Sequence, residues 1–80
     1  MKRLYFKANS DVIKEGDFGD CAYIVEAGSL EVSTYNATNE KHILGKLKVN
    51  DIFGELGLID GLPRSATVKT LENCTLNVLT

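Results

Sequence analysis

Five residues in the second half of the chain have the chemistry of an anion-binding site. Gly54 and Gly57 carry no side chain, so a ligand can approach their backbone N–H groups. Glu55 only accepts hydrogen bonds when it is ionised, which suits a ligand hydroxyl. Arg64 offers a planar fork that matches two phosphate oxygens, and Ser65 adds a hydroxyl and an N–H beside it. Together they predict a pocket for a small anion that also carries a hydroxyl, such as a phosphorylated sugar.

The stretch that carries these residues has its own local pattern. Glu55 stands where the first turn of a helix favours an acid, and Gly61 and Pro63 would end that helix. We expect a single helical turn here, with open N–H groups that favour an anion, and its apolar residues fall at positions 56, 58, 59 and 62. The alternative is a solvated surface loop, in which Arg64 and Glu55 make an ion pair that contributes little.

The elements that must position these residues are strands. Apolar and polar residues alternate along most of the chain; Leu76 and Val78, for example, alternate with Thr75 and Asn77. Turn residues separate the runs, and Gly28 is the clearest hairpin turn. Eight short antiparallel strands are typical of a jelly roll or a flattened barrel. We expect them near residues 4–7, 11–14, 21–26, 29–35, 41–47, 51–53, 65–70 and 74–79.

Length and composition exclude several classes of protein. Eighty residues make one domain at most, and a net charge of -2 disfavours direct binding to nucleic acid. The apolar runs are too short for a membrane segment. One histidine, His42, and two distant cysteines cannot build a common zinc site, which argues against a cupin-like metalloenzyme. The two cysteines read as free thiols, so we expect a cytoplasmic location.

Two motifs resemble the phosphate-binding cassette of cyclic nucleotide-binding domains. Residues 53–58 read FGELGL, and residues 63–68 read PRSATV after a short separation. The order and approximate spacing of the family hold over nearly the whole chain. Further matches lie upstream, at Glu15-Gly16-Asp17, Gly19-Asp20, Tyr23-Ile24-Val25 and Gly28.

The resemblance implies an all-β double-stranded β-helix, or jelly roll, with one short helix in the cassette. It implies a regulatory module, not an enzyme, that binds cyclic AMP or cyclic GMP and no other cofactor. The module would transmit the signal to an effector domain outside this chain. Residues 1–80 would form an incomplete domain, without the family's C-terminal lid helix. The alternative function is a degenerate jelly roll that contacts other proteins and binds no nucleotide.

The resemblance also assigns roles to residues. Glu55 would accept a hydrogen bond from the ribose 2′-hydroxyl, and Arg64 would pair with the exocyclic oxygens of the cyclic phosphate. The backbone N–H groups of Leu56, Gly57 and Ser65 would also reach the phosphate, with Gly54 opening the cassette. Ser65 leaves the choice of nucleotide open, leaning towards cyclic AMP.

Four more positions follow from the same comparison. Glu26, an acid before the hairpin glycine, would orient Arg64. Val32 and Leu44 would line the ribose and the base. Asn50 replaces the glycine that the family usually has before Asp51, and we expect it to keep the left-handed turn there, because Asn tolerates that conformation better than other non-glycine residues.

Overall fold

The computed structural model of the protein describes residues 2–19, 21–55 and 62–79. Each of the eight strands overlaps one of the predicted ranges. The strands are β1 (Lys2–Phe6), β2 (Asp11–Ile13), β3 (Ala22–Ala27), β4 (Leu30–Tyr35), β5 (Lys41–Leu47), β6 (Ile52–Phe53), β7 (Thr67–Thr70) and β8 (Cys74–Leu79).

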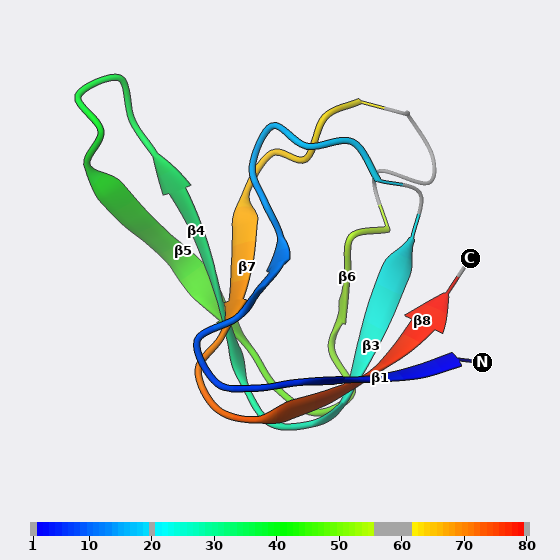
Figure 1. The fold of residues 1–80 in the computed structure, drawn as a ribbon. Helices are drawn as coiled ribbons and strands as arrows, with labels where there is room; N and C mark the ends of the chain where they lie inside the picture. Colours follow the sequence, from blue (N-terminus) through cyan, green and yellow to red (C-terminus); the bar gives the residue numbers. More distant parts are fainter. Residues whose placement is uncertain (1, 20, 56–61, 80) are drawn as a thin grey trace.

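The strands form two antiparallel sheets of four strands each. One sheet has the order β1-β8-β3-β6, and the other has the order β2-β7-β4-β5. Successive strands therefore alternate between the sheets for much of the chain, as in a jelly roll, and the β4–β5 hairpin projects from one side of the molecule (Figure 1). The predicted all-β jelly roll is confirmed. The predicted helical turn lies outside the described residues, and the described residues contain no helix.

The core lies between the two sheets and is built by the alternation seen in the sequence. In β8, Cys74 and Leu76 are buried while Thr75 between them is only half-buried. Leu76 lies on a central strand between β1 and β3 and has no exposed surface. The buried hydrophobic cluster consists of Ile13, Val25, Leu30, Phe53, Val68, Cys74 and Leu76.

A tight glycine turn joins β3 to β4, as predicted. Gly28 has φ +94°, a conformation that side-chain-bearing residues rarely adopt. A Cβ atom at this position would also lie 2.6 Å from Cys74 Sγ and 2.7 Å from the carbonyl oxygen of Asn73. Both the backbone and the close packing therefore require glycine.

A second turn leads into β6 and sets the start of the candidate site. Asn50 adopts φ +79°, which confirms that the left-handed turn survives without glycine. Its N–H donates to the carbonyl oxygen of Val25 (2.9 Å), and Asp51 Oδ2 accepts a hydrogen bond from the N–H of Lys48 (2.9 Å). β6 then pairs with β3, where the rings of Tyr23 and Phe53 stack with centroids 5.2 Å apart. This pairing fixes the strand that delivers Gly54 and Glu55.

Candidate functional site

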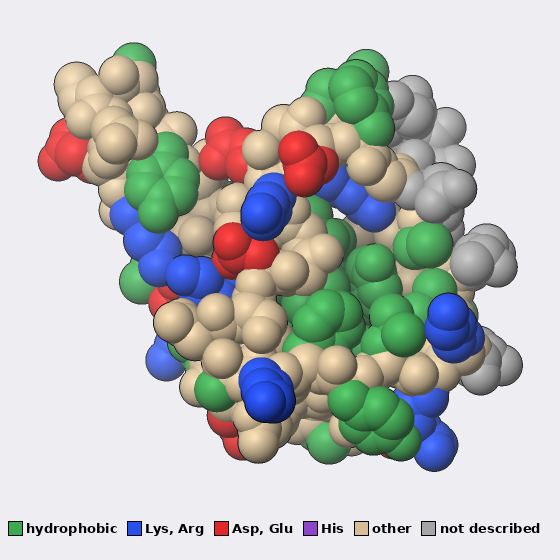
Figure 2. All heavy atoms as spheres, viewed as in Figure 1, with side chains coloured by type: hydrophobic (Ala, Val, Ile, Leu, Met, Phe, Trp, Pro, Cys, Tyr) green, Lys and Arg blue, Asp and Glu red, His purple; other side chains and the backbone are tan. Residues whose placement is uncertain are grey.

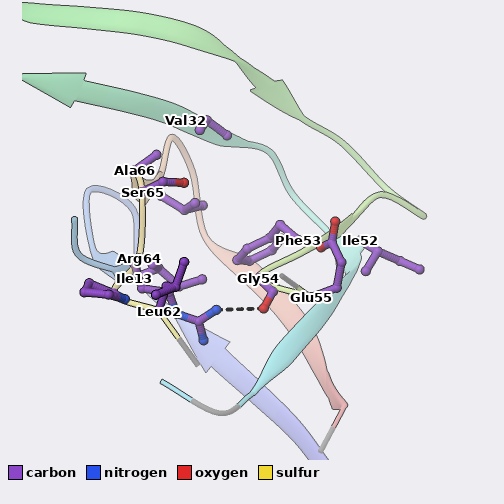
Figure 3. A pocket seen from close by; sticks show the side chains of 12 residues that line it. Ile13, Val32, Ile52, Phe53, Gly54, Glu55, Leu62, Arg64, Ser65 and Ala66 are labelled. Carbon is purple, nitrogen blue, oxygen red and sulfur yellow. Dashed lines mark hydrogen bonds between the residues drawn. The ribbon is translucent and has the colours of Figure 1, made fainter. Parts of the chain in front are cut away.

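A cavity of about 350 Å³ opens where β6 ends and where the chain approaches β7. Its size lies within the range of small-molecule sites, roughly 300–1,000 Å³. Hydrophobic side chains gather in the middle of the face shown in Figure 2, and Figure 3 shows the cavity from close by. The cavity is lined by Ile13, Val32, Ile52, Phe53, Gly54, Glu55, Leu62, Pro63, Arg64, Ser65, Ala66 and Val68.

The end of β6 places one wall of the cavity. Gly54 follows the buried Phe53 and has φ +83°. A Cβ atom at Gly54 would lie 3.1 Å from the carbonyl oxygen of Cys21 and 3.2 Å from Arg64 Nη1, so the position is crowded as well as left-handed. The exposed Glu55 comes next and also lines the cavity.

Arg64 lies beside Gly54 and is held there by hydrogen bonds of its backbone and of its side chain. Its N–H donates to the carbonyl oxygen of Asp17 (2.7 Å), and its own carbonyl oxygen accepts from the N–H of Gly16 (2.8 Å). The guanidinium Nη1 donates to the carbonyl oxygen of Gly54 (2.7 Å; Figure 3), and Nη2 donates to that of Cys21 (2.7 Å). The half-buried Arg64 is therefore fixed in orientation before any ligand binds.

The partners of Arg64 among the described residues leave its charge uncompensated. Backbone carbonyls are dipoles and not anions, so they orient a guanidinium without neutralising it. The ion pairs recorded among the described residues are Arg3 with Glu26 and Lys41 with Glu31, and neither involves Arg64. An anion that binds in the cavity would therefore find a guanidinium that two hydrogen bonds already hold in place.

The structure does not support the predicted role of Glu26. Its carboxylate accepts hydrogen bonds from the guanidinium of Arg3 (3.0 and 3.2 Å) and from the side-chain amide of Asn77 (3.2 Å). Glu26 occupies an irregularity between the Val25↔Leu76 and Ala27↔Thr75 pairs of β3 and β8. Its contacts with Arg3 and Asn77 place the Glu26 side chain over the neighbouring strands β1 and β8. The backbone carbonyls of Gly54 and Cys21, and not Glu26, orient Arg64.

Leu44 is the second residue that the structure places elsewhere. It lies in an irregularity of β5 between Gly45, which pairs with Val32, and Ile43, which pairs with Ser33. An extra residue in a bulge has no cross-strand partner, so the alternation of faces changes at that point. Leu44 is 61% exposed and does not line the cavity, whereas Val32 on the neighbouring strand does, as predicted.

The remaining predicted residues divide into two groups. Gly54, Glu55, Arg64 and Ser65 lie around the same cavity, although residues 54–55 and 64–65 come from separate segments. Leu56 and Gly57 lie outside the described residues.

Sequence reasoning missed the part that β2 and the segment after it play in the site. Ile13, at the end of β2, lines the cavity, and the carbonyl of Cys21 holds Arg64. Every residue has a carbonyl, so no residue type identifies Cys21 in this role. Gly19 did stand out as part of a motif, and the structure places it against Arg64.

This arrangement is suited to binding an amphipathic anion. It combines an oriented cation, a carboxylate that accepts hydrogen bonds and an apolar wall that includes Phe53 and Val68. In the part of the chain that the structure describes, no three His, Cys, Asp or Glu residues are grouped to hold a metal ion. No helix within residues 2–19, 21–55 and 62–79 has the length and hydropathy that a membrane crossing requires.

Comparison with known proteins agrees with this chemistry. The cyclic nucleotide-binding domain family matches residues 3–80. A cAMP-dependent protein kinase regulatory subunit from Debaryomyces hansenii is 41% identical over 69 residues, which are 86% of this chain and 14% of that protein. The chain thus corresponds to a small part of the length of the relatives it matches.

Two solved structures show the same fold. The regulatory domain of Toxoplasma gondii PKA, co-crystallised with cAMP, superposes with a TM-score of 0.92 at 36% identity, covering 98% of this chain and 30% of that one. The EAL enzyme Bd1971 in its cAMP-bound form gives 0.93 at 37% identity, covering 99% and 21%. The resemblance seen in the sequence is confirmed, and the chain belongs to the cyclic nucleotide-binding domain family.

Proposed function

We propose that this chain binds a cyclic nucleotide in the cavity between β6 and the approach to β7, with cyclic AMP preferred over cyclic GMP. The observation that carries the proposal is the placement of Arg64 and Glu55 around one cavity, with Arg64 already oriented by the carbonyls of Gly54 and Cys21. A cyclic phosphodiester carries one negative charge, which one guanidinium and nearby N–H dipoles can balance.

The proposed roles follow the chemistry of each group. Arg64 binds the exocyclic phosphate oxygens, and the backbone N–H groups of Leu56, Gly57 and Ser65 add to this contact. Glu55 accepts a hydrogen bond from the ribose 2′-hydroxyl. Apolar side chains such as Val32 pack against the ribose and the base. The preference for cyclic AMP is supported by Ser65 and by the regulatory domain of Toxoplasma gondii PKA, which was co-crystallised with cAMP. The EAL enzyme Bd1971 has both a cAMP-bound and a cGMP-bound form and favours neither.

The chain acts in this proposal as a regulatory module that passes the signal to an effector domain elsewhere in a longer protein. The kinase regulatory subunits that it resembles support a regulatory role, and the EAL enzyme shows that such a domain also occurs within an enzyme. No cofactor is needed besides the ligand. We place the module in the cytoplasm, because the buried Cys74 is a free thiol, which is typical of a reducing compartment. The net charge of -2 gives no reason to expect contact with nucleic acid.

Parallel calorimetric titrations with cyclic AMP, cyclic GMP and linear 5′-AMP test the proposal. We expect saturable binding of cyclic AMP at one site, weaker binding of cyclic GMP and the weakest binding of 5′-AMP, which carries more charge and lacks the ring constraint. Tighter binding of cyclic GMP would overturn the base preference alone. No binding of either cyclic nucleotide would overturn the proposed function and favour the degenerate jelly roll that contacts proteins.

A further inference from the structure

The segment between β2 and β3 carries two of the family motifs, and four of its described residues, Gly16, Asp17, Gly19 and Cys21, lie close to Arg64. In the first motif, Gly16 and Asp17 bind the backbone of Arg64 through hydrogen bonds of 2.8 and 2.7 Å. After the second motif, the carbonyl of Cys21 accepts from Nη2. The segment thus contacts Arg64 at its main chain and at the end of its side chain.

Glu15 fastens this segment to the sheet. Its N–H donates to Thr67 Oγ1 (3.0 Å), and its carboxylate accepts from Thr34 Oγ1 (2.8 Å) and from the N–H of Tyr35 (3.2 Å). These contacts join the end of β2 to β4 and β7. The segment against which Arg64 lies is therefore hydrogen-bonded to both of these sheet strands.

Gly19 is the residue in this segment whose size matters most. A Cβ atom at Gly19 would lie 2.6 Å from Nη2, 3.0 Å from Nε and 3.1 Å from Cζ of Arg64. These distances are shorter than van der Waals contact, so any larger residue must push the guanidinium away. Gly19 is not among the described glycines with positive φ, which are Gly16, Gly28 and Gly54. Its backbone would accept alanine, so the close approach of Arg64 is the reason for glycine.

We propose that Gly19 is a positioning residue for ligand binding: its missing side chain lets the guanidinium of Arg64 lie flat against the segment and donate to Cys21 and Gly54. This inference rests on the proposed function, because it assigns Gly19 to the phosphate contact of the same site. A guanidinium held in place loses less conformational freedom when the ligand binds, and its remaining donors point in a fixed direction. An added methyl group would displace the fork at little cost to the fold, because the atoms that must move end a flexible side chain.

The test is Gly19→Ala, with Gly45→Ala as the matched control. A Cβ atom at Gly45 would meet no atom within 4 Å, and Gly45 has no positive φ. We expect Gly19→Ala to weaken cyclic AMP binding about tenfold, since small displacements of binding groups carry large penalties. The unliganded variant should melt near the wild-type temperature, and Gly45→Ala should bind as the wild type does.

Two further measurements separate positioning from a general loss of structure. In an Arg64→Ala background, Gly19→Ala should cause no further loss of affinity, because its effect acts through the guanidinium. In the unliganded protein, the Nε–Hε NMR resonance of Arg64 should shift in Gly19→Ala and stay in place in Gly45→Ala.

The outcomes distinguish this inference from the proposed function. A wild-type chain that fails to bind cyclic AMP overturns the proposed function and the ligand role of Gly19 with it. If the wild type binds and Gly19→Ala binds equally well, the positioning role alone is wrong. The positioning role would also be wrong if Gly19→Ala lowered the affinity for cyclic AMP equally in the wild-type and Arg64→Ala backgrounds.

Discussion

Replacement of Arg64 should weaken cyclic nucleotide binding more than replacement of any other described charged residue. The structure gives this side chain two hydrogen bonds of 2.7 Å to backbone carbonyls and no carboxylate partner among the described residues, so its charge is available to a phosphate. Hydrogen bonds to charged groups contribute about 1.5–3 kcal/mol. Arg64→Ala should therefore raise the dissociation constant for cyclic AMP roughly ten- to a hundredfold.

A second substitution separates shape from charge. Arg64→Lys keeps the positive charge, but one ammonium group lacks the planar fork that contacts Gly54 and Cys21 on different sides. We expect an affinity between those of the wild type and Arg64→Ala. An affinity equal to that of the wild type would mean that Arg64 acts as a point charge, and the orientation seen in the structure would not matter.

The chain offers a matched control for this series. Arg3 is 54% exposed and pairs with Glu26 at 3.0 Å on the outer side of the other sheet. Arg3→Ala and Glu26→Gln should both leave cyclic AMP affinity unchanged in calorimetry. Wild-type affinity in Arg64→Ala would refute the assignment of Arg64. A loss in Glu26→Gln comparable to that in Arg64→Ala would show that Glu26 orients Arg64 after all.

Three further predictions concern the ribose contact, the core and the buried thiol. Glu55→Gln should weaken the binding of cyclic AMP about fivefold and the binding of its 2′-deoxy analogue less, because a neutral acceptor makes a weaker hydrogen bond to the 2′-hydroxyl. Equal losses of affinity in parallel titrations would contradict the assignment of Glu55 to the ribose. Leu76→Ala should lower the free energy of unfolding, measured in urea, by about 2–5 kcal/mol, because Leu76 is fully buried. Leu71→Ala should lower it much less, because Leu71 is 43% exposed. Similar losses of stability in the two variants would contradict the described core. Burial raises the pKa of the Cys74 thiol, so this thiol should react slowly in the folded protein at neutral pH. In a Cys21→Ser variant, a maleimide should therefore label Cys74 only after denaturation. Rapid labelling of the folded variant would show that Cys74 is accessible.

Much of the sheet architecture could be predicted because strand patterns are local. The alternation in β8 and the glycine at position 28 determine a strand and a hairpin without knowledge of distant residues. Asn50 is similar, because its tolerance of positive φ is a property of the residue itself. Glu55 and Arg64, which line the cavity, belong to a motif whose chemistry is also local.

The differences between the sequence-based expectations and the structure concern features that depend on contacts between distant strands. The irregularity in β5 interrupts the alternation of faces at Leu44, and strand patterns do not reveal where a bulge falls. Glu26 contacts Arg3 and Asn77 because strand pairing brings β1 and β8 beside β3, which the pattern of β3 alone does not reveal. The contact between Arg64 and the carbonyl of Cys21 joins residues 43 positions apart through the backbone, so no side-chain type signals it. Gly19 stood out in the sequence, but its role becomes clear only when Arg64 is placed beside it.

The central claim is that a cyclic nucleotide enters the cavity between β6 and the approach to β7. The most direct test is a titration of the isotopically labelled chain with cyclic AMP, followed through the backbone amide resonances. We predict saturable shifts concentrated at residues 53–55 and 64–66, with little change at the exposed β4–β5 turn around Asn39. Saturable shifts that leave Gly54, Glu55 and Ser65 unmoved, or no shifts at all, would contradict the claim.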